Sequence, residues 1–181
     1  MDLWSYLRER KNFIYRHWLD LFWEGFGESS VYFKREVDQF TNPFAYHVEE
    51  SFKGILEGIW GEFDWSSLDP HLEKLAQIRA VQEVVPSKAV KFFLDLKKII
   101  RENFGEEILK KFGLEDFLRL EDKINSLLIR YLDFYQRYRE RLFEIRLDEF
   151  KRNNFLLLKR AGFIAELEQE NSSPMETIKK H

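Results

Sequence analysis

The chain has 181 residues, with 34% charged side chains, a formal net charge of -3 and no cysteine. The missing cysteine excludes disulfides, thiol chemistry and cysteine-ligated zinc, and the balanced charge gives no overall attraction to nucleic acid or to an anionic membrane. Charges recur every few residues from Asp2 onward, and no run of about 18 uncharged apolar residues occurs, so we expect a cytoplasmic protein without a membrane span.

The first part of the chain predicts two helices, over 3–24 and 43–59. Apolar side chains recur at helical spacing in the first of them, at Trp4, Leu7, Ile14, Trp18 and Leu21. Residues 25–42 are rich in glycine, serine and charge, which is typical of a loop. Pro43 at a first helical position, after a capping Thr41 or Asn42, predicts where the second helix begins.

A third helix is expected between two prolines. Asp69 before Pro70 predicts its start, and Pro86 predicts its end. At about 100° per residue, Arg79 falls within the arc of the leucines of this helix, and Gln82 lies at the edge of that arc.

The second half of the chain predicts mostly helix. Residues 87–104 form an amphipathic helix, and a shorter one over 106–112 is expected to end at Gly113 in a left-handed conformation. From Glu115 to about Arg160 there is no Gly or Pro, and a straight helix of that length would reach about 65 Å, longer than a small domain is wide. The polar residues 161–181 predict a disordered tail.

These segments predict an all-α fold, either globin-like or a bundle of four or five helices with a long C-terminal helix, in a single domain over 1–160. A seam at helical spacing follows the long helix, at Tyr131, Tyr135, Tyr138 and Leu142. Because such a helix is too long for its own bundle to cover, we expect this seam to form a homodimer interface. Arginines flank the seam together with acidic residues, which favours packing over nucleic-acid binding.

The sequence carries no signature of a catalytic or metal site. Its four histidines form no spaced pair of the H-E-x-x-H kind, and its glycine-containing stretches match no phosphate-binding loop. We therefore expect no enzyme activity, no metal and no cofactor. His17 and His47 lie beside aromatic stripes, which leaves a single axial haem ligand, and so a haem or small-molecule carrier, as a less favoured alternative.

Arg79 and Gln82 raise the main question about a binding site, because that helix face is otherwise apolar. An unpaired buried charge costs several kcal/mol, so we expect Arg79 to be at least half buried, with its guanidinium held by a carboxylate or by helix-end carbonyls. In one interpretation Arg79 fixes the corner at Pro86. In the other, Arg79 and Gln82 line a polar pocket for an anionic or polar signal ligand, with His47 as a third candidate ligand-binding residue.

Two stretches of the sequence resemble the N-terminal domain of RsbT co-antagonist proteins of the RsbRD type. IRAVQ, residues 78–82, is followed by PSKAVKFFLDLKKIIRE, residues 86–102, in the order found in that family. FTNPFAYHV, residues 40–48, is similar to the entry of an earlier helix of the family. The resemblance covers about residues 5–145.

The resemblance implies an all-helical signal-input domain without haem, which dimerises and feeds a regulatory output. In full-length stress regulators of this kind a C-terminal STAS domain carries phosphorylated Ser and Thr and contacts a kinase. That domain would begin about where this sequence ends, so we expect no phosphorelay output here. We expect a non-enzymatic sensory or regulatory module that signals through an unidentified protein partner, with a purely structural interaction subunit as the alternative.

Overall fold

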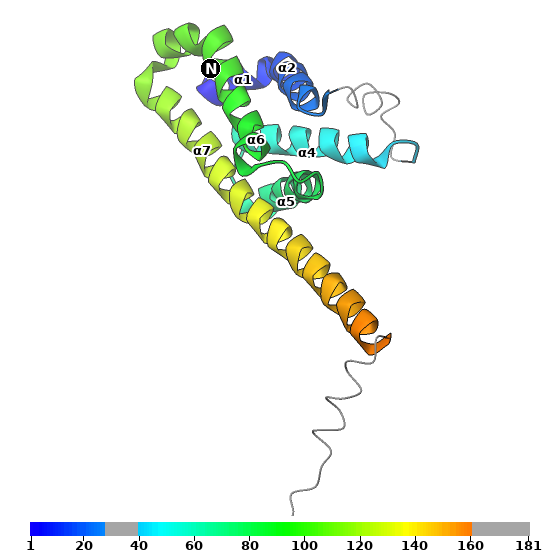
Figure 1. The fold of residues 1–181 in the computed structure, drawn as a ribbon. Coiled ribbons are helices and arrows are strands. Elements are labelled where there is room, and N and C mark those ends of the chain that lie inside the picture. Colours follow the sequence, from blue (N-terminus) through cyan, green and yellow to red (C-terminus); the bar gives the residue numbers. More distant parts are fainter. Residues whose placement is uncertain (28–39, 161–181) are drawn as a thin grey trace, which may run out of the picture. The chain divides into compact units, whose positions relative to one another are not determined.

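The computed structural model describes residues 1–27 and 40–160, and the regular structure within these ranges is helical. Six helices occur there, in the order α1 Leu3–Glu9, α2 Lys11–Glu24, α4 Pro43–Trp60, α5 Trp65–Val81, α6 Pro86–Ala89 and α7 Lys91–Arg160 (Figure 1). The predicted all-α class is confirmed. Most of the loop expected over 25–42, and the whole tail over 161–181, lie outside the described residues.

The chain separates into two compact units, Met1–Arg139 and the part from Glu140 onward. The single domain over 1–160 and the globin-like arrangement therefore stay predictions. None of the helices in the described ranges combines the length and apolarity that a bilayer crossing requires.

Helix starts follow the side chains that can satisfy free backbone N–H groups. Asn42 caps α4 by accepting a hydrogen bond from the backbone N of Ala45 at 3.1 Å, and Pro43 is its first residue, as predicted. The single helix expected over 3–24 is instead two helices, because the backbone leaves the helical path at Arg10. That arginine donates from Nη1 to the carbonyl of Tyr6 at 2.9 Å.

The start and end predicted for the third helix were both wrong. α5 begins at Trp65 because the Asp64 carboxylate accepts from the backbone N of Ser66 and of Ser67, at 3.2 Å each, and Pro70 lies inside the helix. At the other end α5 finishes at Val81, and Pro86 opens the short helix α6 instead of ending α5.

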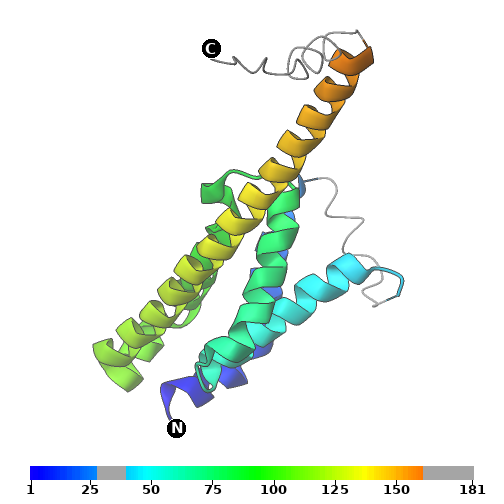
Figure 2. The same ribbon diagram turned by 90° about the horizontal axis from the view of Figure 1, so that it is seen from below.

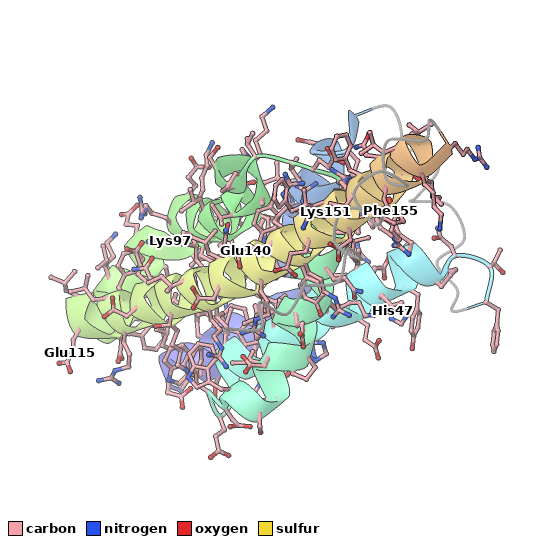
Figure 3. All side chains as sticks on the ribbon, turned by 60° about the horizontal axis from the view of Figure 1, so that its bottom comes forward. His47, Lys97, Glu115, Glu140, Lys151 and Phe155 are labelled. Carbon is pink, nitrogen blue, oxygen red and sulfur yellow. The ribbon has the colours of Figure 1, made fainter. Side chains whose placement is uncertain are left out.

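α7 is two helical arms joined at Gly113, whose φ of 86° confirms the predicted left-handed residue. The first arm runs without a break through Gly105, so the separate short helix expected over 106–112 is not present. Within Met1–Arg139 the two arms lie side by side, because Glu121 on the second arm pairs with Arg101 at 2.6 Å and with Lys97 at 3.4 Å (Figure 1). Lys97 on the first arm is labelled in Figure 3.

Aromatic rings fill the centre of the first unit, and the Phe92 ring lies at their middle. Its centroid is 5.5 Å from that of Phe22 on α2, 5.7 Å from that of Phe52 on α4, and 5.1 Å from that of Tyr131 on the second arm of α7. The indole Nε1 of Trp18 donates to the Phe92 carbonyl at 2.6 Å. One residue thus joins α2, α4 and both arms of α7.

Two glycines let α4 and α5 approach closely (Figure 2). A Cβ atom on Gly54 would lie 2.1 Å from Nε2 of His71, and one on Gly58 would lie 2.4 Å from Cδ2 of Leu68. The spacing of four residues places both glycines on one helix face. The position of α5, and with it the position of Arg79, depends on this contact.

Gly58→Ala should destabilise the protein by about 1–3 kcal/mol, because the new methyl group overlaps Leu68, although alanine is the better helix former. Gly105→Ala is the matched control. A Cβ there would meet only Cγ of Arg101 at 3.6 Å, so this variant should gain roughly 0.5–1 kcal/mol. Urea unfolding of the two variants checks the opposite signs, and equal effects would contradict the close approach of α4 and α5.

Candidate functional site

Arg79 lies on the buried face of α5, as its position in the sequence predicted. Leu72, Leu75 and Ala76 share that face and are fully buried, and only 5% of the Arg79 surface is exposed. The chain therefore places a guanidinium group in a largely apolar core.

The partners of Arg79 differ from those expected. Nη1 donates to Oε1 of Gln82 at 3.1 Å, and the guanidinium carbon lies 4.8 Å from the ring centroids of both Phe22 and Phe26. Within the described ranges the hydrogen-bond partner of the guanidinium is the Gln82 amide, and neither a carboxylate nor a helix-end carbonyl holds the group, so that part of the prediction was wrong. The positive charge is balanced by an amide oxygen and two aromatic faces, which compensate a buried cation only in part.

Two buried polar atoms in this region have no hydrogen-bond partner among the residues that the structure describes, Nε of Arg79 and the hydroxyl oxygen of Tyr131. The neighbouring Tyr135 hydroxyl, by contrast, donates to the Val84 carbonyl. Burial lowers the pKa of Arg79 below its usual value, while Tyr131 and Tyr135 act in the opposite direction. Burial also raises the pKa of Tyr131 far above the usual tyrosine value, and the nearby Arg79 opposes this change. These groups form a polar cluster that is only partly satisfied.

A pocket of about 340 Å³ opens beside this cluster. The residues that line it come from α2 and its C-cap, the end of α5, the connection to α6, α6 itself and the first arm of α7, namely Leu21, Phe22, Glu24, Gly25, Arg79, Val84, Lys88, Lys91, Phe92 and Asp95. We call it the Arg79 pocket. Lys91 is already paired, since its Nζ lies 2.7 and 2.8 Å from the two carboxylate oxygens of Asp95.

Another hollow, of about 370 Å³, lies between α2 and α4 and is also lined by three cationic residues, Lys11, Arg16 and Lys53. Its charges are largely matched, because Lys11 pairs with Glu57 at 3.1 Å and Lys53 pairs with Glu49 at 3.4 Å. A mainly compensated surface of this kind has less need of an anionic ligand than the buried guanidinium of Arg79.

The structure brings together two of the three residues predicted to bind a ligand. Gln82 contacts Arg79 directly, although it is exposed and is not among the residues that line the Arg79 pocket. His47 is not among the residues that line the Arg79 pocket, and it lies 3.8 Å from Glu50 on its own helix (Figure 3).

The haem alternative gains no support from the surroundings of its histidines. His17 is exposed, its Nδ1 lies 2.9 Å from the Phe13 carbonyl, and it does not line the Arg79 pocket. Within residues 1–27 and 40–160, no three His, Asp or Glu side chains gather as a metal site would require.

The seam predicted to form a dimer interface is mostly used inside this chain. Tyr131 and Tyr135 are 0% and 1% exposed, so they belong to the core and cannot contact a second copy, which corrects the prediction for these two residues. Tyr138 is half-buried and donates from its hydroxyl to Glu73 at 3.0 Å. Leu142 keeps intermediate exposure.

A different set of apolar residues is exposed on the helical segment Glu140–Arg160. Phe143, Leu147, Phe150 and Leu157 fall within an arc of about 80° at 100° per residue, and each is exposed. We call these four residues the apolar stripe. Figure 3 labels Glu140, Lys151 and Phe155 along the same segment. The spacing of three and four residues is visible in the sequence, but the predicted interface followed the tyrosines on another face of the helix.

Arg79→Met should raise the stability of the protein by roughly 1–2 kcal/mol, because it removes a buried charge that no carboxylate of the described residues pairs with, and it keeps a similar volume. Arg130→Met is the control, since Arg130 also lies over aromatic rings but bonds to both oxygens of Asp69 and is exposed, so its loss should weaken the fold. Thermal and urea unfolding measure both. A marked loss of stability in Arg79→Met would identify Arg79 as a structural clamp.

The raised pKa of Tyr131 predicts a loss of stability in alkali. Below the usual tyrosine pKa of 10.0 the hydroxyl is neutral in both states and adds no pH dependence. Above it the unfolded chain releases a proton that the folded chain keeps, so unfolding becomes easier, by about 1.4 kcal/mol at pH 11. Tyr131→Phe should abolish this part of the loss of stability between about pH 8 and pH 11. Urea unfolding midpoints at about pH 8 and pH 11 measure the loss in both proteins. An unchanged difference between the two pH values would contradict the assignment.

Comparison with known protein families gives a match over most of the chain. The family model described as RsbT co-antagonist protein rsbRD N-terminal domain matches residues 14–149, which include α4, α5, α6, the Arg79 pocket and the first part of the apolar stripe. No curated protein matches the chain, and no solved structure does. Because the match spans most of the sequence, the chain belongs to the family of RsbT co-antagonist protein RsbRD N-terminal domains.

Proposed function

We propose that this chain is a non-enzymatic, cytoplasmic signal-input module that forms a homodimer through the apolar stripe and passes its signal to a regulatory protein partner. The family to which it belongs suggests a sensory input domain of the stressosome type. The observation that carries the proposal is the exposure of the stripe, where Phe143, Phe150 and Leu157 are 67%, 65% and 60% exposed.

The stripe has the spacing of a helix that packs along another helix. Phe143, Phe150 and Leu157 are separated by seven residues each, and Leu147 lies four residues after the first of them. In water, an exposed row of large apolar side chains favours association, because burying apolar surface lowers the free energy by about 25 cal/mol for each Å². Asn154 continues the row at the next position. A single amide at such a position restricts the register of paired helices.

The charges beside the stripe support a second copy of this chain as the occupant. Glu144 and Lys151 flank one edge, and Arg146 flanks the other. The segment therefore carries both signs of charge near its apolar residues, so that two copies are not driven apart by like charges. A twofold contact also needs only one kind of surface, which a single stripe supplies.

α7 connects the two features that the proposal uses. It contributes Tyr131 and Tyr135 next to Arg79, and the stripe follows farther along the same helix. A change at the pocket that altered the packing of these tyrosines would act on the helix that bears the stripe. The proposal thus gives a physical route from a sensed event to a protein contact.

Phe150→Glu should convert a dimer to a monomer, because it places a charge in the centre of the proposed interface. Leu156→Glu is the matched control: Leu156 is 52% exposed and lies about 120° from Phe150 around the helix. Size-exclusion chromatography with light scattering at about 100 μM measures the mass of both. A monomeric wild-type protein would refute the dimer, and loss of the dimer only in Leu156→Glu would move the interface to the face of Tyr138 and Leu142.

A further inference from the structure

We propose that the Arg79 pocket binds a small organic monocarboxylate that has an apolar body. The inference names the class of ligand for the signal-input role, and in that sense it rests on the proposed function. Binding itself can be measured whether or not the protein dimerises.

The described part of the chain places no anion against the Arg79 guanidinium. Arg79 is 95% buried and lines the pocket, yet among residues 1–27 and 40–160 its hydrogen bond is to the neutral amide of Gln82, not to a carboxylate. Burying a guanidinium without an anion is costly, and a carboxylate is the partner that its planar donors fit best. A ligand carboxylate would supply the charge that the described part of the chain does not place there.

There is space for a ligand beside the guanidinium of Arg79. Gly25 lines the pocket, and a Cβ atom on it would lie 3.1 Å from Nη2 and 3.9 Å from Nη1 of Arg79. The glycine therefore leaves open the side of the guanidinium that its terminal nitrogens face. Nε has no partner in the described part of the chain but is closed off from solvent, so a ligand would bond to Nη2 first.

The net charge of the residues that line the Arg79 pocket favours a ligand with a single negative charge. Three cations, Arg79, Lys88 and Lys91, line the pocket with two carboxylates, those of Glu24 and Asp95, which leaves one excess positive charge. Lys91 and Asp95 neutralise each other at 2.7 Å. A doubly charged phosphate would exceed the remaining positive charge and would be repelled by Glu24.

The apolar lining and the volume of the Arg79 pocket also restrict the kind of ligand. Leu21, Phe22, Val84 and Phe92 line the pocket beside the charged groups, so one end of a ligand meets hydrocarbon and the other end meets the guanidinium. The volume of about 340 Å³ is near the lower end of the range for small-molecule sites, roughly 300–1,000 Å³. This combination fits a short or aromatic carboxylate better than a large anion.

The test compares sodium benzoate with benzamide, which has nearly the same shape without the charge, and with inorganic phosphate. Each is titrated into the full chain and followed by calorimetry and by NMR. Benzoate should bind with a dissociation constant on the order of 1 mM or tighter, as expected for a ligand of this size, and at least about ten-fold more tightly than benzamide or phosphate.

Three variants locate the binding. Arg79→Met should remove the preference for benzoate over benzamide, whereas Arg130→Met, which keeps the pocket intact, should retain it. Gly25→Ala keeps every charge but sets a methyl group against Nη2, and because Gly25 has a helical φ of -64° this change introduces no backbone strain. It should weaken benzoate binding at least about five-fold, and it tests the site even where Arg79→Met alters the fold.

Clear outcomes overturn the inference. It fails if benzoate does not bind at about 20 mM, if benzamide binds equally well, if phosphate binds more tightly, or if Arg79→Met binds benzoate as the wild type does. The light-scattering measurement on the same samples separates this failure from that of the proposed function. A dimer that ignores benzoate refutes the ligand alone, and a monomer that binds it refutes the dimer alone.

Discussion

The packing around Phe92 is the constraint on which the rest of the first unit depends. Its ring contacts residues from α2, α4 and the second arm of α7, and its carbonyl accepts the indole hydrogen bond of Trp18. The same residue forms a wall of the Arg79 pocket. Aromatic cores are close-packed, so a change of shape on one side of this ring must be absorbed on the other. Packing at the pocket and packing in the core are therefore coupled through Phe92. Such coupling suits a domain in which binding at one place changes the packing at another.

Polar groups in this core are kept at a cost to stability. Arg79 Nε and the Tyr131 hydroxyl lack hydrogen-bond partners within residues 1–27 and 40–160. A unit with so many buried aromatic rings does not need either polar group for its hydrophobic stabilisation. Natural proteins tolerate such groups where function requires them, because selection acts on stability only as a threshold. The combination of a buried cation, an unsatisfied hydroxyl and an adjoining pocket is more informative than any one of these features.

Sequence reasoning succeeded where a local rule decides the structure. The start of α4 at Pro43, the left-handed Gly113 and the burial of Arg79 with its neighbouring leucines follow from backbone chemistry and helical periodicity. The choice of Asn42 over Thr41 as the cap was left open by the sequence. It failed where two local signals compete, as when Asp64 rather than Asp69 started α5. It also failed where tertiary neighbours decide, because periodicity shows that Tyr131 and Tyr135 face an apolar partner but not that the partner is their own core. Lys88 and Glu24 reach the pocket only through the fold, so no spacing could indicate them.

The reversal of the chain at Gly113 has a consequence for the order of folding. Arg101 and Glu121, which pair across the two arms of α7, are only 20 residues apart in the sequence, whereas Trp18 must reach Phe92 across 74 residues. Closing a short loop costs less chain entropy than closing a long one, and helices adjacent in the sequence associate early. We therefore expect the hairpin of the two arms to form first and to serve as the template on which the helices before it dock.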